Sequence, residues 1–232
     1  MKKKIKPLII QKTIKVRYKL SFMVLRVITP KLYKNLDTIT LNKSKNYLLE
    51  INNQIEIRPS FSFMKDIFDK KLVIGVEIGV YQGKNSQFIL KGLNIKKLFL
   101  VDIWDDYEGI DHIWHNKNNY DIVLGKFKNN KRIQIIKNTS VDACKLFENN
   151  SLDFIYIDAN HKYSYVYDDI SLWYPKVKIG GIISGHDIML KSGNYPILNA
   201  VKDFCFINHI NYEISAPDWF FIKEGELIEK EN

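Results

Sequence analysis

Apolar residues occur in short continuous runs along most of the chain, separated by stretches in which apolar positions recur every three or four residues. The continuous runs predict five strands, at 72–80, 97–103, 133–137, 152–158 and 181–186. The periodic stretches between them predict helices, at 84–92, 115–128, 140–148 and 163–174. Because the strand runs are apolar throughout rather than alternating, they predict a mostly parallel sheet with helices on both faces. Regular alternation of strand and helix is typical of a doubly wound α/β fold.

Both ends of this pattern carry further elements. A short helix is expected at 61–68, and residues 197–209 again have helical periodicity. Strands expected at 212–215 and 219–223 are joined through Ala216-Pro217-Asp218, a hairpin-type connection. A chain of 232 residues has the length of one sizeable α/β domain. We therefore expect a single domain at 61–232, preceded by an extension at 1–60.

Charge is unevenly distributed along the chain. The formal net charge is +9, yet residues 1–36 hold eleven Lys or Arg residues and no Asp or Glu. The rest of the chain has 24 basic and 26 acidic side chains, so the expected domain is nearly neutral. A nucleic-acid-binding domain usually carries its basic charge on a folded face. We therefore expect no sequence-specific nucleic-acid partner.

The basic arm at 1–36 mixes cations with large apolar residues. One hypothesis is that it binds an anionic membrane surface; the alternative is a solvated extension or one that packs on the domain. The arm lacks the long apolar core and cleavage site of a signal peptide, and no run of about 20 apolar residues predicts a transmembrane helix. Two isolated cysteines, Cys144 and Cys205, imply buried thiols rather than a disulfide framework. We expect a cytoplasmic protein, with peripheral association at the inner membrane face as a further hypothesis.

Two motifs at the ends of the first two strands favour a nucleoside-containing cofactor. The first is E-x-G-x-x-x-G starting at Glu77, in which Gly79 and Gly83 let the backbone turn tightly and approach a ligand. A pyrophosphate-binding turn would read G-x-G-x-x-G instead, and a carboxylate suits a cationic ligand better. The second is Asp102, 23 positions after Gly79, where it could accept hydrogen bonds from ribose hydroxyls. Taken singly, these motifs also fit a tight turn and a helix cap.

Ionisable residues follow the fourth and fifth predicted strands. Asp158 and His161 follow one strand, and His186 and Asp187 follow the next. Since neighbouring parallel strands end at the same edge of a sheet, the two pairs should meet in one cleft. Either histidine could act as a general base, because imidazole titrates near neutral pH, and the two aspartates could orient it or hold a metal. Each histidine could equally be a structural hydrogen-bonding residue.

The chain resembles a known family at this set of motifs. They read V-E-I-G-V-Y-Q-G-K-N-S, V-D-I-W, N-T-S-V-D-A, D-F-I-Y-I-D-A-N-H-K-Y, K-I-G-G-I-I-S-G-H-D and D-W-F-F-I-K. In this order they resemble the class I S-adenosylmethionine-dependent methyltransferases, in particular the small-molecule group with macrocin-type O-methyltransferases and cephalosporin hydroxylase-type proteins. The resemblance implies a Rossmann-like sheet of seven strands, with the last strand antiparallel.

The resemblance also implies roles for individual residues. Those near S-adenosylmethionine would be Glu77, Gly79, Tyr81, Gly83, Ser86, Asp102, Thr139, Ser140 and Asp158. The catalytic residues would be Asp158, His161, His186 and Asp187. Metal-dependent relatives often have two carboxylates where this chain has His186 and Asp187. A Mg²⁺ ion held by Asp158 and Asp187 would therefore have few oxygen ligands.

The sequence thus predicts an O-methyltransferase for a small polar acceptor, with a sugar hydroxyl of a surface glycan or glycolipid intermediate as the first choice. The polar, aromatic stretch at 104–121 suits an acceptor lid, in which Trp104, Tyr107 and Trp114 would stack on the acceptor. The missing G-x-G-x-x-G argues against a nicotinamide-dependent oxidoreductase. The main alternative is a non-catalytic nucleotide-binding or membrane-adaptor module that retains the fold. Whether the chain forms a homo-oligomer is left open.

Overall fold

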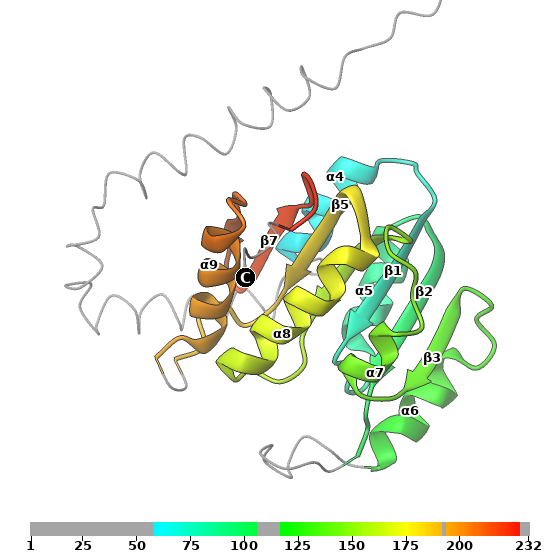
Figure 1. The fold of residues 1–232 in the computed structure, drawn as a ribbon. Coiled ribbons are helices and arrows are strands. Elements are labelled where there is room, and N and C mark those ends of the chain that lie inside the picture. Colours follow the sequence, from blue (N-terminus) through cyan, green and yellow to red (C-terminus); the bar gives the residue numbers. More distant parts are fainter. Residues whose placement is uncertain (1–57, 106–116, 192–193, 228–232) are drawn as a thin grey trace, which may run out of the picture. The chain divides into compact units, whose positions relative to one another are not determined.

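A seven-stranded sheet in the order β3-β2-β1-β4-β5-β7-β6 forms the centre of the computed structural model (Figure 1). The structure describes residues 58–105, 117–191 and 194–227, which all belong to one compact unit, Ile55–Asn232. The strands are β1 (Val73–Ile78), β2 (Ile95–Asp102), β3 (Ile133–Lys137), β4 (Leu152–Ile157), β5 (Val177–Gly185), β6 (Glu213–Ser215) and β7 (Asp218–Ile222). Strands β1 to β5 pair in parallel, whereas β7 runs antiparallel to both of its neighbours. This arrangement confirms the predicted mostly parallel sheet with its last strand antiparallel.

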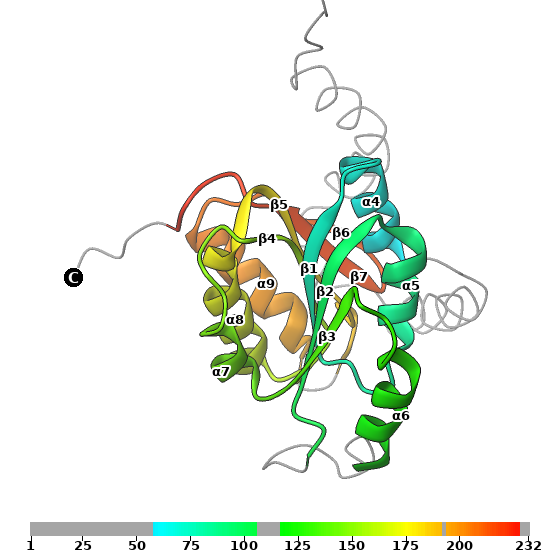
Figure 2. The ribbon, with the colours of Figure 1, turned by 90° about the vertical axis from the view of Figure 1, so that its right-hand side faces the viewer.

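Helices cover both faces of the sheet, as predicted (Figure 2). One face carries α4 (Pro59–Phe68), α5 (Lys84–Gly92) and α6 (Lys117–Phe127), and the other carries α7 (Ser140–Cys144), α8 (Tyr163–Trp173) and α9 (Pro196–Ile207). A short 3-10 helix, Tyr174–Lys176, links α8 to β5. Side chains of β4 point alternately to the two faces, so that Phe154 and Tyr156 join one apolar cluster while Ile155 and Ile157 join the other. Both faces of the sheet are therefore buried under helices, which explains the continuous apolar runs in the strands.

Most predicted elements are present, and the differences lie at their ends. β5 begins at Val177, four residues before the predicted strand, and β2 begins at Ile95, two residues early. The missed residues at the start of β5 include Lys178 and Gly180, which do not continue an apolar run. The helix predicted at 140–148 ends at Cys144. Cys144 and Cys205 are both free and buried, as expected.

The N-terminal predictions fall mainly on residues that the structure leaves undescribed. The basic arm at 1–36 lies outside the described residues, as do residues 37–57 of the expected extension. Within the described ranges, none of the helices combines the length and the apolar character needed for a membrane span. The described part of the chain starts with Arg58, directly before α4.

Candidate functional site

The carboxyl ends of β1, β4 and β5 lie side by side and bring the predicted site residues together. Ile78 of β1 pairs with Ile157 of β4, and Ile157 pairs with Gly185 of β5. The next residues along these strands, Gly79, Asp158 and His186, therefore leave the sheet at one edge. Backbone bonds hold this edge, because Asp158 N–H donates to the carbonyl of Ile78 at 2.7 Å and His186 N–H donates to the carbonyl of Ile157 at 3.0 Å.

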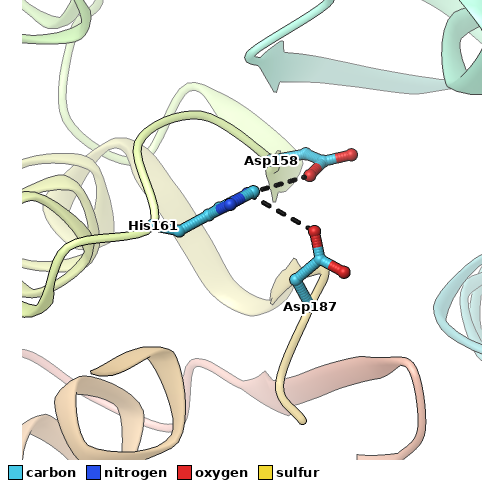
Figure 3. A group of neighbouring side chains, drawn as sticks. All are labelled: Asp158, His161 and Asp187. Atoms are coloured by element: carbon cyan, nitrogen blue, oxygen red, sulfur yellow. Dashed lines mark ion pairs between the residues drawn. The ribbon is translucent and has the colours of Figure 1, made fainter. Parts of the chain in front are cut away.

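Asp158, His161 and Asp187 form one half of the site, and all three are partly buried (Figure 3). His161 Nε2 lies 3.4 Å from Asp187 Oδ2 and 3.7 Å from Asp158 Oδ1. His161 enters from the loop before α8, whereas Asp187 follows β5 with a left-handed backbone (φ 56°). Left-handed backbone is costly for most residues but is tolerated by Asp, and it often occurs at functional sites. The turn at Asp187 directs its carboxylate towards both histidines.

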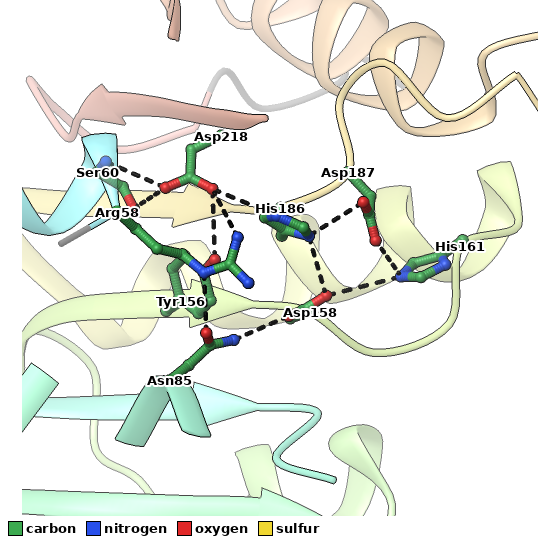
Figure 4. Close-up of polar contacts among 9 residues, drawn as sticks. All are labelled: Arg58, Ser60, Asn85, Tyr156, Asp158, His161, His186, Asp187 and Asp218. Carbon is green, nitrogen blue, oxygen red and sulfur yellow. Dashed lines mark hydrogen bonds and ion pairs between the residues drawn. The ribbon is translucent and has the colours of Figure 1, made fainter. Parts of the chain in front are cut away.

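His186 occupies the buried side of the same cluster (Figure 4). Its Nδ1 lies 3.1 Å from Asp187 Oδ1 and 3.7 Å from Asp158 Oδ1, and its Nε2 lies 3.9 Å from Asp218 Oδ1. The two oxygens of Asp187 thus face one imidazole each, and Asp158 Oδ1 faces both. The predicted meeting of Asp158, His161, His186 and Asp187 in one place agrees with this geometry.

The cluster shifts the ionisation of its members. Burial works to lower the pKa of His161, but the contacts with Asp158 and Asp187 outweigh it and raise the pKa above the usual imidazole value. The pKa of His186 is raised in the same way, with burial opposed by Asp187 and Asp158. Burial works to raise the pKa of Asp187, yet the two imidazoles hold it below the usual range. The aspartates therefore stabilise the protonated form of both imidazoles.

A second group of polar residues surrounds the cluster, and sequence reasoning did not assign it. Asn85 Nδ2 donates to Asp158 Oδ2 at 3.0 Å, and Asn85 Oδ1 accepts from Arg58 Nε at 2.8 Å. Asp218 is fully buried, and burial raises its pKa. It accepts from Ser60 N–H at 3.1 Å and from the Tyr156 hydroxyl at 3.4 Å (Figure 4).

Asn85 and Asp218 stand in motifs that carry the resemblance, but neither residue was assigned a role there. Asn85 lies two positions after Gly83 in the glycine-containing motif, although the motif alone did not single it out. Arg58 and Asp218 are 160 residues apart, and no spacing rule connects them. They meet because α4 lies against β7, where Phe63 stacks on Phe220 with ring centroids 4.3 Å apart.

Asp102 braces the turn that follows β1. Its Oδ2 accepts from the N–H groups of Val80 (2.8 Å) and Tyr81 (2.9 Å), and its Oδ1 accepts from Trp104 N–H (2.9 Å). Tyr81 and Trp104 both have left-handed backbones, with φ of 52° and 43°. The Trp104 indole N–H donates to the carbonyl of Tyr81 at 2.9 Å and fastens the two loops together.

Glu77 and Ser86 lie beneath this turn rather than on its surface. Both side chains are fully buried, and the Ser86 hydroxyl donates a short hydrogen bond to Glu77 Oε2. Burial raises the pKa of Glu77 to about 8, although the bond from Ser86 opposes the shift. Glu77 Oε1 has no hydrogen-bond partner among the described residues. The placement gives both residues a role in shaping the turn, and contact with a cofactor stays a prediction for them.

The third expected cofactor segment lies at the start of α7. Thr139 caps this helix by accepting from Asp142 N–H at 3.1 Å. The Ser140 hydroxyl donates to Asp169 of α8 and accepts from the Trp173 indole N–H at 2.8 Å. Burial raises the pKa of Asp169 to about 7, with the Ser140 bond opposing it. Contact of Thr139 and Ser140 with adenine stays a prediction.

The structure contradicts one part of the acceptor-lid prediction. Trp104 is only 2% exposed and packs against Tyr120, with ring centroids 5.2 Å apart. It is therefore part of the fold and cannot stack on an acceptor as predicted. Tyr107 and Trp114 lie outside the described residues.

The donor atoms of the cluster are compatible with a divalent cation. Asp158, His161 and Asp187 can each direct one ligand atom into a common space, with these atoms within 4.8 Å of one another. His161 Nε2 is enclosed and has no hydrogen-bond partner in the described part of the chain. Two carboxylates and one imidazole suit Mn²⁺, Fe²⁺ or Zn²⁺ at least as well as Mg²⁺, which prefers oxygen ligands.

A family model of known proteins matches the part of the chain that carries this geometry. Residues 76–188 match the family model of a methyltransferase domain. The matched segment begins inside β1 and ends just after Asp187, so it contains the glycine turn, Asp102 and the whole cluster at the ends of β4 and β5. No curated protein sequence matches the chain.

Solved structures with a similar fold include methyltransferases of low sequence identity. A putative caffeoyl-CoA O-methyltransferase from Staphylococcus aureus superposes with a TM-score of 0.55 at 13% identity, covering 83% of this chain and 96% of that one. The O-methyltransferase from Bacillus cereus in complex with SAH gives 0.53 at 14% identity, covering 88% and 97%. The MycE methyltransferase from the mycinamycin biosynthetic pathway, in complex with Mg and SAH, gives 0.51 at 16% identity, covering 70% of this chain and 48% of that one.

Proposed function

We propose that this chain, a class I S-adenosylmethionine-dependent methyltransferase, transfers the methyl group to a hydroxyl oxygen of a small polar acceptor. One observation carries the proposal. The carboxylate and imidazole cluster stands at the ends of β4 and β5, directly beside the glycine turn after β1. A sulfonium cofactor at that turn would present its methyl group next to residues that can deprotonate an alcohol.

Methyl transfer is an in-line displacement in which the acceptor oxygen forms a bond to the methyl carbon while the carbon–sulfur bond breaks. The protein contributes mainly by positioning the two reactants and by removing the hydroxyl proton, which is worth about 10²–10⁴ in rate. We assign the removal of this proton to His161, which would act as the general base. Its side chain is 39% exposed, whereas His186 is 11% exposed and its Nε2 points towards buried Asp218.

The carboxylates prepare His161 for this role. Asp187 Oδ2 and Asp158 Oδ1 flank its Nε2 and would stabilise the imidazolium that forms on proton transfer. His186 in turn holds Asp187 from the other side. Should a divalent cation bind Asp158 and Asp187, it would lower the pKa of a hydroxyl placed beside it.

The base assignment is tested with His161→Gln and the matched control His209→Gln, which changes an exposed histidine outside the cluster. We expect His161→Gln to lower kcat by about 10²–10⁴-fold and to leave the affinity for S-adenosylhomocysteine within about twofold. The control should leave both unchanged. An unchanged kcat in His161→Gln would transfer the role of base to another residue.

Cofactor use is tested first, by calorimetric titration of S-adenosylmethionine and S-adenosylhomocysteine into the purified protein and into Asp102→Ala, with and without Mg²⁺ or Mn²⁺. Binding by wild type that weakens in the variant supports the proposal. No binding by folded wild type would refute it and would favour a non-catalytic module.

The acceptor class belongs to the proposal as well. We favour a sugar hydroxyl of a surface glycan or glycolipid intermediate, because the resemblance is to enzymes of small polar molecules and residues 1–36 are strongly basic. The test is methyl transfer from labelled S-adenosylmethionine to a panel of nucleotide sugars, glycolipids and catechols. Methylation of catechols alone would overturn the sugar assignment but keep the reaction type.

Membrane association of the basic arm needs a separate test. The full chain and a variant lacking residues 1–36 are compared for binding to vesicles with and without anionic lipid. Binding that requires both the arm and the anionic lipid supports peripheral association at a membrane. Equal binding by the two proteins would refute it.

A further inference from the structure

Arg58 extends into the site from the residue before α4, and only some of its guanidinium N–H groups have hydrogen-bond acceptors there (Figure 4). Its Nε donates to Asn85 Oδ1 at 2.8 Å. Its Nη1 lies 3.8 Å from Asp218 Oδ1, beyond hydrogen-bond distance. Nη1 is enclosed, and among the described residues it has no hydrogen-bond acceptor.

Asp218 does not supply the missing hydrogen-bond acceptor for this guanidinium. Its Oδ2 already accepts from both the backbone N–H and the hydroxyl of Ser60, and its Oδ1 accepts from the Tyr156 hydroxyl. Leaving a buried charged donor without an acceptor is costly. The Arg58 side chain as a whole is nevertheless 20% exposed, so it is not sealed off from solvent. The arrangement favours an anionic ligand group.

The neighbours of Arg58 indicate what such a ligand would look like. Two hydrogen bonds link a cation, an amide and a carboxylate in a row, namely Arg58, Asn85 and Asp158. Asn85 is the second residue of α5, so the row runs beside the glycine turn that the methyltransferase family model includes. An amino acid carries a carboxylate and an ammonium group on one carbon, which is the complementary order of charges. S-adenosylmethionine has such an amino-acid end in addition to its sulfonium.

We propose that Arg58 binds the α-carboxylate of the methionine moiety of S-adenosylmethionine, with Asp158 facing its ammonium group. This inference rests on the proposed cofactor and assigns a residue outside the matched family segment. The planar guanidinium can donate two parallel hydrogen bonds to a carboxylate, which lysine cannot. The other source of the same chemistry is a carboxylate or phosphate on the acceptor.

The test compares two ligands that differ only in the carboxylate. S-adenosylhomocysteine and its decarboxylated analogue, which keeps the amine, are titrated calorimetrically into full-length wild type, Arg58→Gln and Arg58→Lys. We expect Arg58→Gln to weaken S-adenosylhomocysteine binding by roughly ten- to a hundredfold and to change the affinity for the analogue by less than about twofold. Arg58→Lys should give an intermediate loss, again for S-adenosylhomocysteine alone.

The matched control is Lys84→Gln, which removes the exposed cation at the first position of α5. It should change neither affinity. A carboxylate-specific loss in Lys84→Gln and not in Arg58→Gln would overturn the proposal in favour of Lys84. Comparing two ligands on one variant also separates carboxylate binding from general damage. Equal losses for both ligands would mean that Arg58 only supports the fold, and this too would overturn the proposal.

Two further outcomes separate this inference from its premises. Unchanged S-adenosylhomocysteine affinity in Arg58→Gln, together with a raised KM for the acceptor, would place the anion on the acceptor and overturn the assignment to the cofactor. Failure of folded wild type to bind S-adenosylhomocysteine at all would overturn the proposed cofactor and the inference with it. A loss that is confined to the Arg58 variants and to S-adenosylhomocysteine, with the decarboxylated analogue unaffected, would occur only if both are correct.

Discussion

Replacing Gly79 by Ala tests how closely β1 approaches β4 at the site. Gly79 has φ of +84°, a conformation that costs an L-residue about 1–2 kcal/mol. A Cβ placed there would also lie 2.6 Å from Ala159 Cα and closer still to the carbonyl of Asp158. These are backbone atoms, so no side chain can turn aside. Overpacking of this kind typically adds about 1–3 kcal/mol, and the total expected loss of unfolding free energy is about 2–5 kcal/mol.

Gly180→Ala is the matched control. Gly180 has nearly the same backbone, with φ of +81°, but a Cβ there would meet no atom within 4 Å. The control should therefore lose only the conformational part, about 1–2 kcal/mol. For a domain of this size one kcal/mol lowers Tm by about 2–4 °C. We expect a decrease of about 2–8 °C for Gly180→Ala and about 4–20 °C for Gly79→Ala.

Urea unfolding of both variants measures the difference directly, and calorimetric binding of S-adenosylhomocysteine measures its effect on the site. Gly79→Ala should also weaken ligand binding, because it displaces the backbone that carries Asp158. Gly180→Ala should bind as wild type does. Unfolding free energies of the two variants within about 0.5 kcal/mol of each other would refute the close approach of the two strands.

Three further predictions concern other parts of the domain. Asp169 has a pKa raised by burial to about 7, so it favours folding while protonated, and this contribution is lost as pH rises from about 4 to about 7; Asp169→Asn should flatten the fall in Tm over that range, and an unchanged slope would contradict the assignment. Asp153, 2% exposed at the opposite end of β4, accepts from Lys71 Nζ and Ile74 N–H; Asp153→Asn should cost about 1–3 kcal/mol in urea unfolding while the affinity for S-adenosylhomocysteine stays constant. Trp104→Phe replaces the indole by a smaller aromatic ring and removes a hydrogen bond worth about 0.5–1.5 kcal/mol; because this bond ties the loop after β2 to the turn after β1, the variant should weaken S-adenosylhomocysteine binding, and an unchanged affinity would contradict that role.

Most of the fold could be predicted from local pattern. Strands buried on both faces are apolar at nearly every position, and the helices between them are apolar on one side. Each element can therefore be recognised from its own local pattern of apolar residues. The ends of elements were less predictable. The first residues of β5 include Lys178 and an exposed Ile179, which do not continue the apolar run and lie where the register with β4 shifts, between Val177 and Ile182.

The part of the site formed by residues directly after the strands could be predicted from the sequence. Asp158 and His186 directly follow β4 and β5, and any parallel sheet with this strand order places them together. The role expected for Trp104 was wrong for a physical reason. Its position after β2 is compatible with an exposed loop, but its indole N–H bonds to the carbonyl of Tyr81 and its ring is buried.

The sequence by itself determined the order of strands and helices, the glycine turn, Asp102 and the four ionisable residues at the ends of β4 and β5. These features are local, because helix formation, strand formation and tight turns depend mainly on residues that are close in the sequence. Only the tertiary structure decided that Arg58 and Asp218 join the same site, 160 residues apart. Their meeting depends on the packing of α4 against β7, and such packing is determined by the shapes of distant side chains rather than by any spacing along the chain.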